Sequence, residues 1–131
     1  MTGCRLECEM EEKIRKIIRK GRIIALATAS KDGKPDLICV ECCGLFDNKI
    51  LIADCQFNKT LLNLKDNSQV SIMISNGKDY FQIKGKAEYF TSGKWFDKVT
   101  KINEGTEYKP KGALLVSCEE IYDLNKCEKV V

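Results

Sequence analysis

The stretch Ile50-Leu51-Ile52-Ala53-Asp54-Cys55-Gln56-Phe57-Asn58-Lys59-Thr60-Leu61-Leu62-Asn63-Leu64 joins an apolar run, a polar loop and a short amphipathic segment. The pattern predicts a buried strand over 50–54 and a helix that begins at Asn58-Lys59-Thr60. A helix N-terminus carries unpaired N–H groups and partial positive charge, so it attracts anions. Because a lysine and a threonine occupy the first turn, this stretch indicates a bound phosphate group. Many similar strand-to-helix turns bind nothing, and that alternative stays open.

The composition predicts one globular domain spanning residues 1–131. Hydrophobic residues make up 44% of the chain and charged residues 31%, which is typical of soluble proteins. Apolar runs are shorter than the roughly 18 residues of a membrane span, and the first 20 residues lack the apolar core of a signal peptide. We therefore expect a cytoplasmic protein that does not bind a membrane. The net charge of +3 is too small to predict nucleic-acid binding.

Residues from about 9 to 20 predict an amphipathic helix that ends at Gly21. Met10, Ile14, Ile17 and Ile18 form one apolar stripe at helical spacing. The basic residues then lie on the solvated face near the C-terminal end, where positive charge suits the helix dipole. Binding of nucleic acid or of a membrane surface by this basic face is the alternative.

The remaining pattern predicts short strands joined by tight turns. Asp32-Gly33, Asp47-Asn48 and Asn76-Gly77 are hairpin signals. The predicted strands span residues 22–29, 36–44, 49–54, 70–74, 80–90 and 112–118, and the predicted helices span about 59–66 and a segment with Ser92 as N-cap. Consecutive hairpins with short helices between them indicate a mainly β fold, a closed antiparallel barrel over about 22–125 with helices packed outside.

Eight cysteines and no histidine narrow the available chemistry. Without the commonest general base and metal ligand, catalysis depends on a cofactor, a thiol, a lysine or a carboxylate. Cys4, Cys8, Cys39 and Cys42 could form a four-thiolate metal site. Cys39 and Cys42 would point to opposite faces of one strand, so we expect no metal there. Cys55 precedes the phosphate-binding turn and could be a reactive thiol.

The order of these motifs resembles the FMN-binding split barrels related to pyridoxamine 5′-phosphate oxidase. The resemblance covers about residues 23–90 and continues more weakly to 117. The matching segments are Ala25-Leu26-Ala27-Thr28-Ala29, Asp32-Gly33-Lys34-Pro35, residues 50–53, Asn58-Lys59-Thr60, residues 64–71 and residues 82–88.

The resemblance implies a six-stranded antiparallel split β-barrel of Greek-key type that forms a homodimer and binds FMN between the subunits. The flavin ring would lie against the second and third strands, and its phosphate would bind at Lys59 and Thr60. The implied cofactor-binding residues are Ile38, Cys39, Val40, Glu41, Ile52, Ala53, Asp54, Cys55, Asn58, Lys59, Thr60 and Asn63.

Two departures from the family pattern change what we expect. Many relatives begin the second strand with an arginine that helps to hold the phosphate, whereas this chain has Leu37. Weaker FMN binding, or a substitute contact from Lys34, would follow. The oxidase also uses a C-terminal Arg-x-His segment to bind its pyridoxal substrate, and a chain without histidine is not expected to oxidise vitamin B6.

The resemblance predicts a flavoprotein that acts as an oxidoreductase or in electron transfer. The flavin would supply the chemistry, with Cys55 as a redox tuner, and no side chain is identified as a catalytic acid or base. The alternatives are a non-enzymatic flavin carrier or store, a deazaflavin-binding relative and a cysteine-thiolate metal protein. The absence of histidine disfavours haem.

Overall fold

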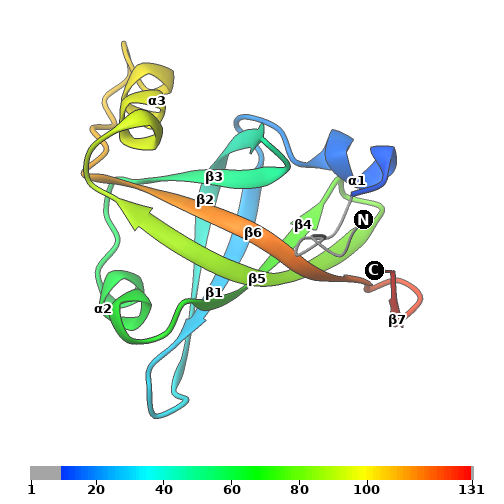
Figure 1. Cartoon of the computed structure of the whole chain (residues 1–131). Helices are drawn as coiled ribbons and strands as arrows, with labels where there is room; N and C mark the ends of the chain where they lie inside the picture. The colour runs from blue at the N-terminus through cyan, green and yellow to red at the C-terminus, as the bar shows by residue number, and fades with distance from the viewer. Residues whose placement is uncertain (1–9, 131) are drawn as a thin grey trace, which may run out of the picture.

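Strands dominate residues 10–130, the part of the chain that the computed structural model describes (Figure 1). In chain order the elements are α1 (Glu12–Ile17), β1 (Ile23–Ala29), β2 (Pro35–Phe46), β3 (Lys49–Asp54), α2 (Lys59–Asp66), β4 (Gln69–Ser75), β5 (Tyr80–Phe90), α3 (Lys94–Ile102), β6 (Gly112–Asp123) and β7 (Glu128–Lys129).

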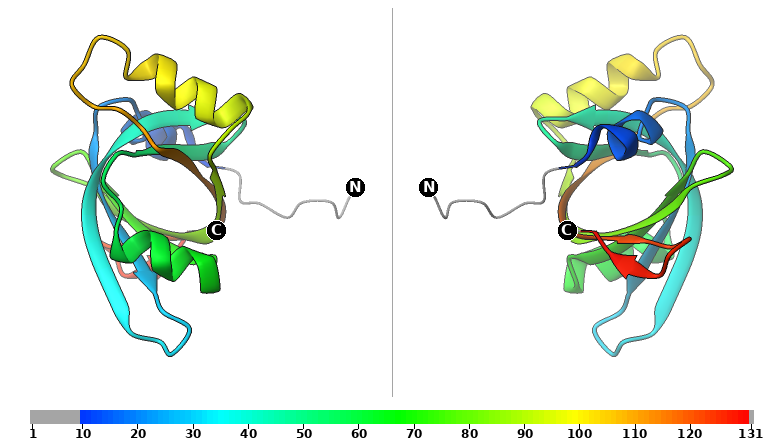
Figure 2. Two further views of the ribbon diagram at one scale, coloured as in Figure 1. Left: turned by 90° about the vertical axis from the view of Figure 1, so that its left-hand side faces the viewer. Right: turned by 90° about the vertical axis from the view of Figure 1, so that its right-hand side faces the viewer.

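Six of these strands close into an antiparallel barrel, which confirms the predicted fold class. The strand order is β3-β2-β1-β4-β5-β6, and pairing of β3 with β6 closes the ring seen in Figure 2. The connection from β3 through α2 places β4 beside β1, which is the expected Greek-key arrangement. The short β7 pairs with the end of β6 and adds a strand that the sequence did not predict.

Strand β3 is buried on both faces, which explains its continuous apolar sequence. Ile50 and Ile52 belong to the core inside the barrel, whereas Leu51 lies in a second core outside it. In that second core, Val99 of α3 packs with Leu51 against the outside of the barrel. Alternation along a strand sends neighbouring side chains to opposite faces, so a fully apolar strand needs a cover on each side.

Two helices cover the ends of the barrel. Ile14 and Ile17 of α1 join the barrel core at one end, and Leu61 and Leu64 of α2 pack against it near the other (Figure 1). The predicted apolar stripe of the first helix is thus confirmed as a core contact. None of the helices in the described part of the chain is long and apolar enough to cross a membrane.

The first helix is shorter than predicted, and Gly21 is not its C-cap. It spans Glu12–Ile17, and its cap residue Ile18 is already extended. The Gly21 N–H donates to the Cys42 carbonyl at 2.9 Å, and the Cys42 N–H donates to the Arg22 carbonyl at 2.8 Å. Pairing with β2 therefore ends the helix before its sequence pattern does. The predicted start at residue 9 lies outside the described residues.

Two other predicted boundaries are wrong. Ser92 does not cap α3, because the cap residue is Gly93, with φ of 89° and no side-chain bond to the helix. Strand β2 continues beyond the predicted residue 44, because Gly44 adopts φ of 124° in a bulge and the strand resumes after it. The turn after β2 is as predicted, since Asp47 and Asn48 both have positive φ, as a two-residue hairpin turn requires.

Candidate functional site

A cavity of about 690 Å³ opens where β2 and β3 separate. The two strands pair only from Cys42 to Phe46 on β2 and from Lys49 to Ile52 on β3. Beyond that point, β2 stays paired with β1 and β3 with β6. The cavity is lined by Lys20, Gly21, Ile23, Ile38, Cys39, Val40, Glu41, Cys42, Cys43, Ala53, Cys55, Gln56, Phe57, Ile102, Asn103, Thr106 and Tyr108.

The β2 wall of the cavity is an open strand edge. Residues 38–41 pair with β1 on one side and with no strand of the described chain on the other. Ile38 and Val40 pack against the barrel core, whereas Cys39 and Glu41 are exposed. Unpaired backbone N–H and C=O groups need a hydrogen-bond partner when they are covered. This edge can therefore bind a planar polar ligand through its backbone.

The segment that follows α3 forms the opposite wall. The Thr106 hydroxyl donates to the Asn103 carbonyl at 2.7 Å and accepts a bond from the Tyr108 N–H at 3.1 Å. The Asn103 amide donates to the Val99 carbonyl at 2.8 Å, which attaches the segment to the helix. Sequence reasoning missed this wall. Its only signal was an aromatic residue, Tyr108, in a polar loop.

Four thiols line the same cavity. Burial raises the pKa of Cys42 to about 11, and burial also raises the pKa values of Cys43 and Cys55. These three thiols stay protonated near neutral pH, so they are weak nucleophiles and weak metal ligands. Residues 10–130 contain no cluster of cysteines and carboxylates able to hold a metal ion.

Two of the four thiols considered for a metal site, Cys4 and Cys8, lie outside the described residues. The other two point to different surroundings, as expected from strand alternation. Cys39 is exposed, and Cys42 is buried in the barrel core.

Asp54 fixes the loop between β3 and α2. Its carboxylate is fully buried, accepts the Phe57 N–H at 2.6 Å and accepts the Tyr89 hydroxyl. The Lys111 N–H donates to the Asp54 carbonyl at 2.7 Å, and the Lys111 Nζ donates to the Phe57 carbonyl at 2.8 Å. The Asp54 side chain therefore holds Phe57 in the cavity wall and does not itself line the cavity.

The predicted phosphate-binding residues lie beside the cavity, at the start of α2, and do not line it. Asn58 precedes the helix without a side-chain capping bond, and Lys59 is exposed. Thr60 is buried and its hydroxyl donates to Asp36 at 3.2 Å. Asn63 is buried and its amide donates to the Thr28 hydroxyl at 3.0 Å. Asn58 is exposed as well, so Lys59 is the charged member of this set whose side chain is accessible.

Half of the predicted site residues therefore meet in one place. The cavity brings together Ile38, Cys39, Val40, Glu41, Ala53 and Cys55. Ile52 is fully buried in the barrel core, and Asp54 lies behind the loop. Residues 58–63 follow the cavity wall directly, because Phe57 is its last member on that segment.

Residues 10–125 match the pyridoxamine 5′-phosphate oxidase family. The chain belongs to this family. An uncharacterized protein of Methanocaldococcus jannaschii, MJ0282, is 35% identical over 120 residues, which are 87% of this chain and 79% of that protein. The family assignment covers β1 to β6, the two helices between them and the cavity.

Several solved structures share the barrel. HupZ of Group A Streptococcus superposes with a TM-score of 0.84 at 18% identity, covering 94% of this chain and all of HupZ. An FMN-binding protein from Syntrophomonas wolfei superposes with a TM-score of 0.69 at 19% identity. The match covers 84% of this chain and 82% of that protein. A structure named F420 reductase superposes with a TM-score of 0.67 at 15% identity. The match covers 86% of this chain and 98% of that one. At these identities the likeness shows the fold and does not select a cofactor.

Proposed function

We propose that this protein binds FMN in the cavity between β2 and β3 as a homodimer, and that it acts as an oxidoreductase or electron-transfer protein. The observation that carries the proposal is the open edge of β2 along the cavity. Six of the residues that the family resemblance assigns to the cofactor lie on the cavity wall. A volume of about 690 Å³ is also within the range of small-molecule sites, roughly 300–1,000 Å³.

An apolar outer face of the barrel supports the dimer. Leu37 is 67% exposed on β2, Ile23 is 57% exposed on β1 and Met73 is 39% exposed on β4. The register places these strands side by side, with Cys39, Ala25 and Met73 in one row and the exposed Glu41 opposite Ile23. Exposed apolar side chains on adjacent strands are typical of a surface that another protein covers.

The apolar face is continuous with the cavity. Ile23 and Cys39 belong to both the exposed face and the cavity wall. A second copy of the chain that covered this face would therefore also cover the mouth of the cavity and exclude water from it. This arrangement agrees with the expectation that the flavin lies between two subunits.

The phosphate would bind at Lys59 and at the free N–H groups of the first turn of α2. Thr60 and Asn63 would support this turn, since their polar groups already bond to Asp36 and Thr28. Leu37 supplies no charge where many relatives have an arginine. FMN affinity should therefore depend strongly on Lys59.

When bound, the flavin would supply the hydride or electron transfer. The chain would orient the ring through the backbone of residues 38–41 and would keep the adjacent thiols protonated. No carboxylate or lysine on the cavity wall has a hydrogen-bond geometry that marks it as a proton donor. The proposal therefore assigns no catalytic side chain.

Purification of the full chain tests the proposal. We expect a flavin absorption spectrum, or tight rebinding of added FMN that quenches its fluorescence, and a dimer mass by light scattering. Absence of FMN binding in a folded dimer would reject the proposal. Added deazaflavin in the same titration tests the alternative cofactor.

Turnover separates an enzyme from a carrier. If reduced nicotinamides bleach the bound flavin and an electron acceptor restores it, the reductase version holds. If no reductant in the panel does so, the protein is a flavin carrier or store. Less than one zinc or iron per chain, after anaerobic purification, would reject the thiolate metal protein that includes Cys4 and Cys8.

A further inference from the structure

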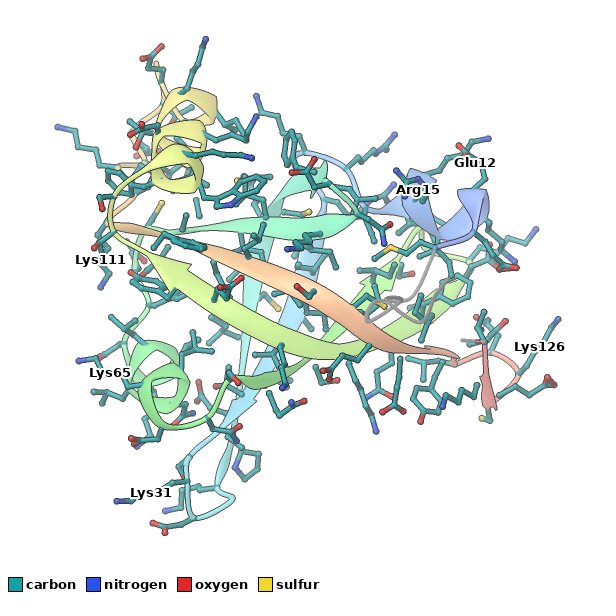
Figure 3. The ribbon with its side chains drawn as sticks, viewed as in Figure 1. Glu12, Arg15, Lys31, Lys65, Lys111 and Lys126 are labelled. Carbon is teal, nitrogen blue, oxygen red and sulfur yellow. The ribbon has the colours of Figure 1, made fainter. Side chains whose placement is uncertain are left out.

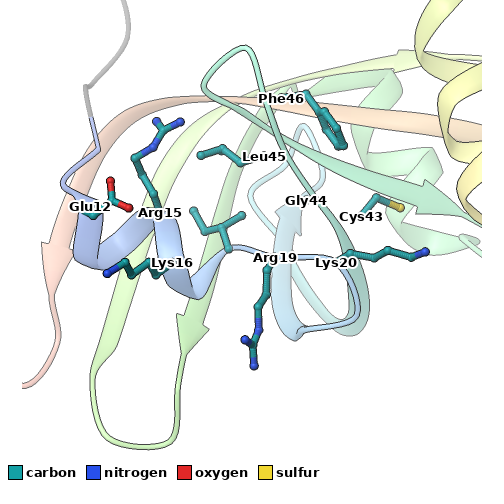
Figure 4. A pocket seen from close by; sticks show the side chains of 10 residues that line it. Glu12, Arg15, Lys16, Arg19, Lys20, Cys43, Gly44, Leu45 and Phe46 are labelled. Atoms are coloured by element: carbon teal, nitrogen blue, oxygen red, sulfur yellow. The ribbon is translucent and has the colours of Figure 1, made fainter.

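A second groove, of about 440 Å³, lies between α1 and the bulge of β2 (Figure 4). Four exposed basic side chains and one carboxylate, Glu12, line it. The basic residues are Arg15, Lys16, Arg19 and Lys20, and the remaining lining residues are Ile18, Cys43, Gly44, Leu45 and Phe46. The groove thus combines a largely apolar floor with an excess of positive charge.

The dipole of α1 accounts for only part of this charge. Arg15 and Lys16 lie in the last turn, where the dipole favours them, whereas Arg19 and Lys20 lie beyond the end of the helix at Ile17. Arg15 is oriented by a different contact, because its Nη1 donates to the Asn48 side chain at 2.9 Å in the turn between β2 and β3. A guanidinium has five N–H donors, so Arg15 keeps others for a ligand. Half of the basic residues of the groove, Arg19 and Lys20, therefore come from the segment after the helix and are not explained by its dipole.

The groove joins the proposed flavin cavity. Lys20 and Cys43 line both, and the Lys20 side chain extends toward the end of the groove where Cys43 lies (Figure 4). Lys20 is close enough for its charge to act on the Cys43 thiol. A molecule that reached the cavity from this side would cross the basic groove.

We propose that this groove binds the anionic part of the small molecule that exchanges electrons with the flavin. The inference rests on the proposed function, because the flavin must occupy the adjoining cavity. Arginine pairs with phosphate and carboxylate through two parallel hydrogen bonds, and lysine adds a point charge. The partner is therefore a phosphorylated or multiply carboxylated small molecule whose redox-active end enters the cavity.

Calorimetric titration of the full chain tests the inference with inorganic pyrophosphate and with citrate, which stand for the two anion types. We expect at least one of them to bind the FMN-loaded protein, more weakly as salt rises. The double variant Lys16→Glu with Arg19→Glu should weaken that binding at least about tenfold, a loss of about 1.4 kcal/mol. Neither residue lines the flavin cavity, so FMN affinity should be unchanged.

The matched control is Lys31→Glu with Lys126→Glu, which makes the same charge change at two exposed sites away from the groove (Figure 3). Equal loss in both double variants would mean a bulk charge effect and would overturn the inference. Loss of anion binding when FMN is added would assign the groove to the cofactor phosphate and would also overturn it. If the protein bound a short single-stranded oligonucleotide but neither pyrophosphate nor citrate, the inference would also be overturned.

Failure of the proposed function gives a different result. If the wild-type chain binds no FMN, the flavin assignment is wrong and the groove inference is overturned with it, even if the FMN-free chain binds pyrophosphate or citrate. If FMN binds and neither pyrophosphate nor citrate does, the flavin assignment stands and the groove inference is wrong.

Discussion

The Tyr89 hydroxyl on β5 donates a hydrogen bond to the buried carboxylate of Asp54 at the end of β3. The same carboxylate accepts the N–H of Phe57, a residue of the cavity wall. Tyr89 therefore connects β5, across β6, to the loop that precedes α2. Gly112 leaves space for this contact, because a Cβ there would lie 2.0 Å from the Tyr89 hydroxyl oxygen.

Tyr89→Phe should destabilise the protein by about 1–3 kcal/mol, because a buried carboxylate loses one of its donors. Urea unfolding at neutral pH measures the loss. Tyr122→Phe is the matched control, since that hydroxyl donates to Glu120 at 2.5 Å, and this carboxylate is half-buried whereas that of Asp54 is fully buried. The control should lose much less stability, and an equal loss in the two variants would contradict the prediction.

The contribution of Tyr89 should also depend on pH. Burial, and then the bond to Asp54, raise the pKa of Tyr89 well above its usual value. The unfolded chain loses this proton near about pH 10, whereas the folded chain keeps it to higher pH. Stabilisation is therefore complete below about pH 10 and decreases as pH rises further. We expect the free-energy difference between wild type and Tyr89→Phe to be smaller at about pH 11 than at about pH 8, and a constant difference would refute this.

The sequence predicted correctly the elements whose bounds are set by their own apolar pattern and by the turns next to them. Strand β3 and helix α2 have the predicted bounds, Lys49–Asp54 and Lys59–Asp66. The two-residue turn at Asp47-Asn48 and the apolar run after it set where β3 begins and ends. The end of α1 was missed because it depends on hydrogen bonds between Gly21 and Cys42, which are distant in sequence.

Only part of the candidate site was predicted, because one of its walls and the burial of two of its residues depend on contacts between segments that are distant in sequence. The β2 wall followed from the family resemblance and the order of strands. The wall formed by Asn103, Thr106 and Tyr108 could not be predicted, because nothing in that polar segment indicates that it folds back toward β2. Sequence spacing also suggested that Thr60 and Asn63 face a ligand, whereas tertiary contacts with Asp36 and Thr28 bury both.

Lys59→Ala should weaken FMN binding by about 1.5–3 kcal/mol, the value of a hydrogen bond to a charged group. Quenching of FMN fluorescence during titration measures the affinity. Lys65→Ala is the matched control, because it removes an exposed lysine from the last turn of the same helix. Its FMN affinity should match wild type. Full affinity in Lys59→Ala would reject the phosphate assignment.

Gly85→Ala should destabilise the barrel by about 2–3 kcal/mol. A Cβ at this position would lie 2.0 Å from the Ser117 carbonyl oxygen, where the register of β5 and β6 shifts. The two strands must separate to admit the methyl group. Lys86→Ala changes the next, exposed residue and should have little effect. Equal urea midpoints for the two variants would show that the barrel tolerates a side chain at this crossing.

Leu37→Glu should convert the proposed dimer to a monomer and weaken FMN binding with it. Leu37 is the most exposed apolar side chain on the β2, β1 and β4 face, and a carboxylate there would lose its water in an interface. Light scattering at several protein concentrations measures the oligomeric state. Leu62→Glu is the control, because Leu62 is 53% exposed on α2, away from that face. If Leu37→Glu stays dimeric while Leu62→Glu dissociates, the interface lies at α2 and a partner subunit does not close the cavity from the β2 side.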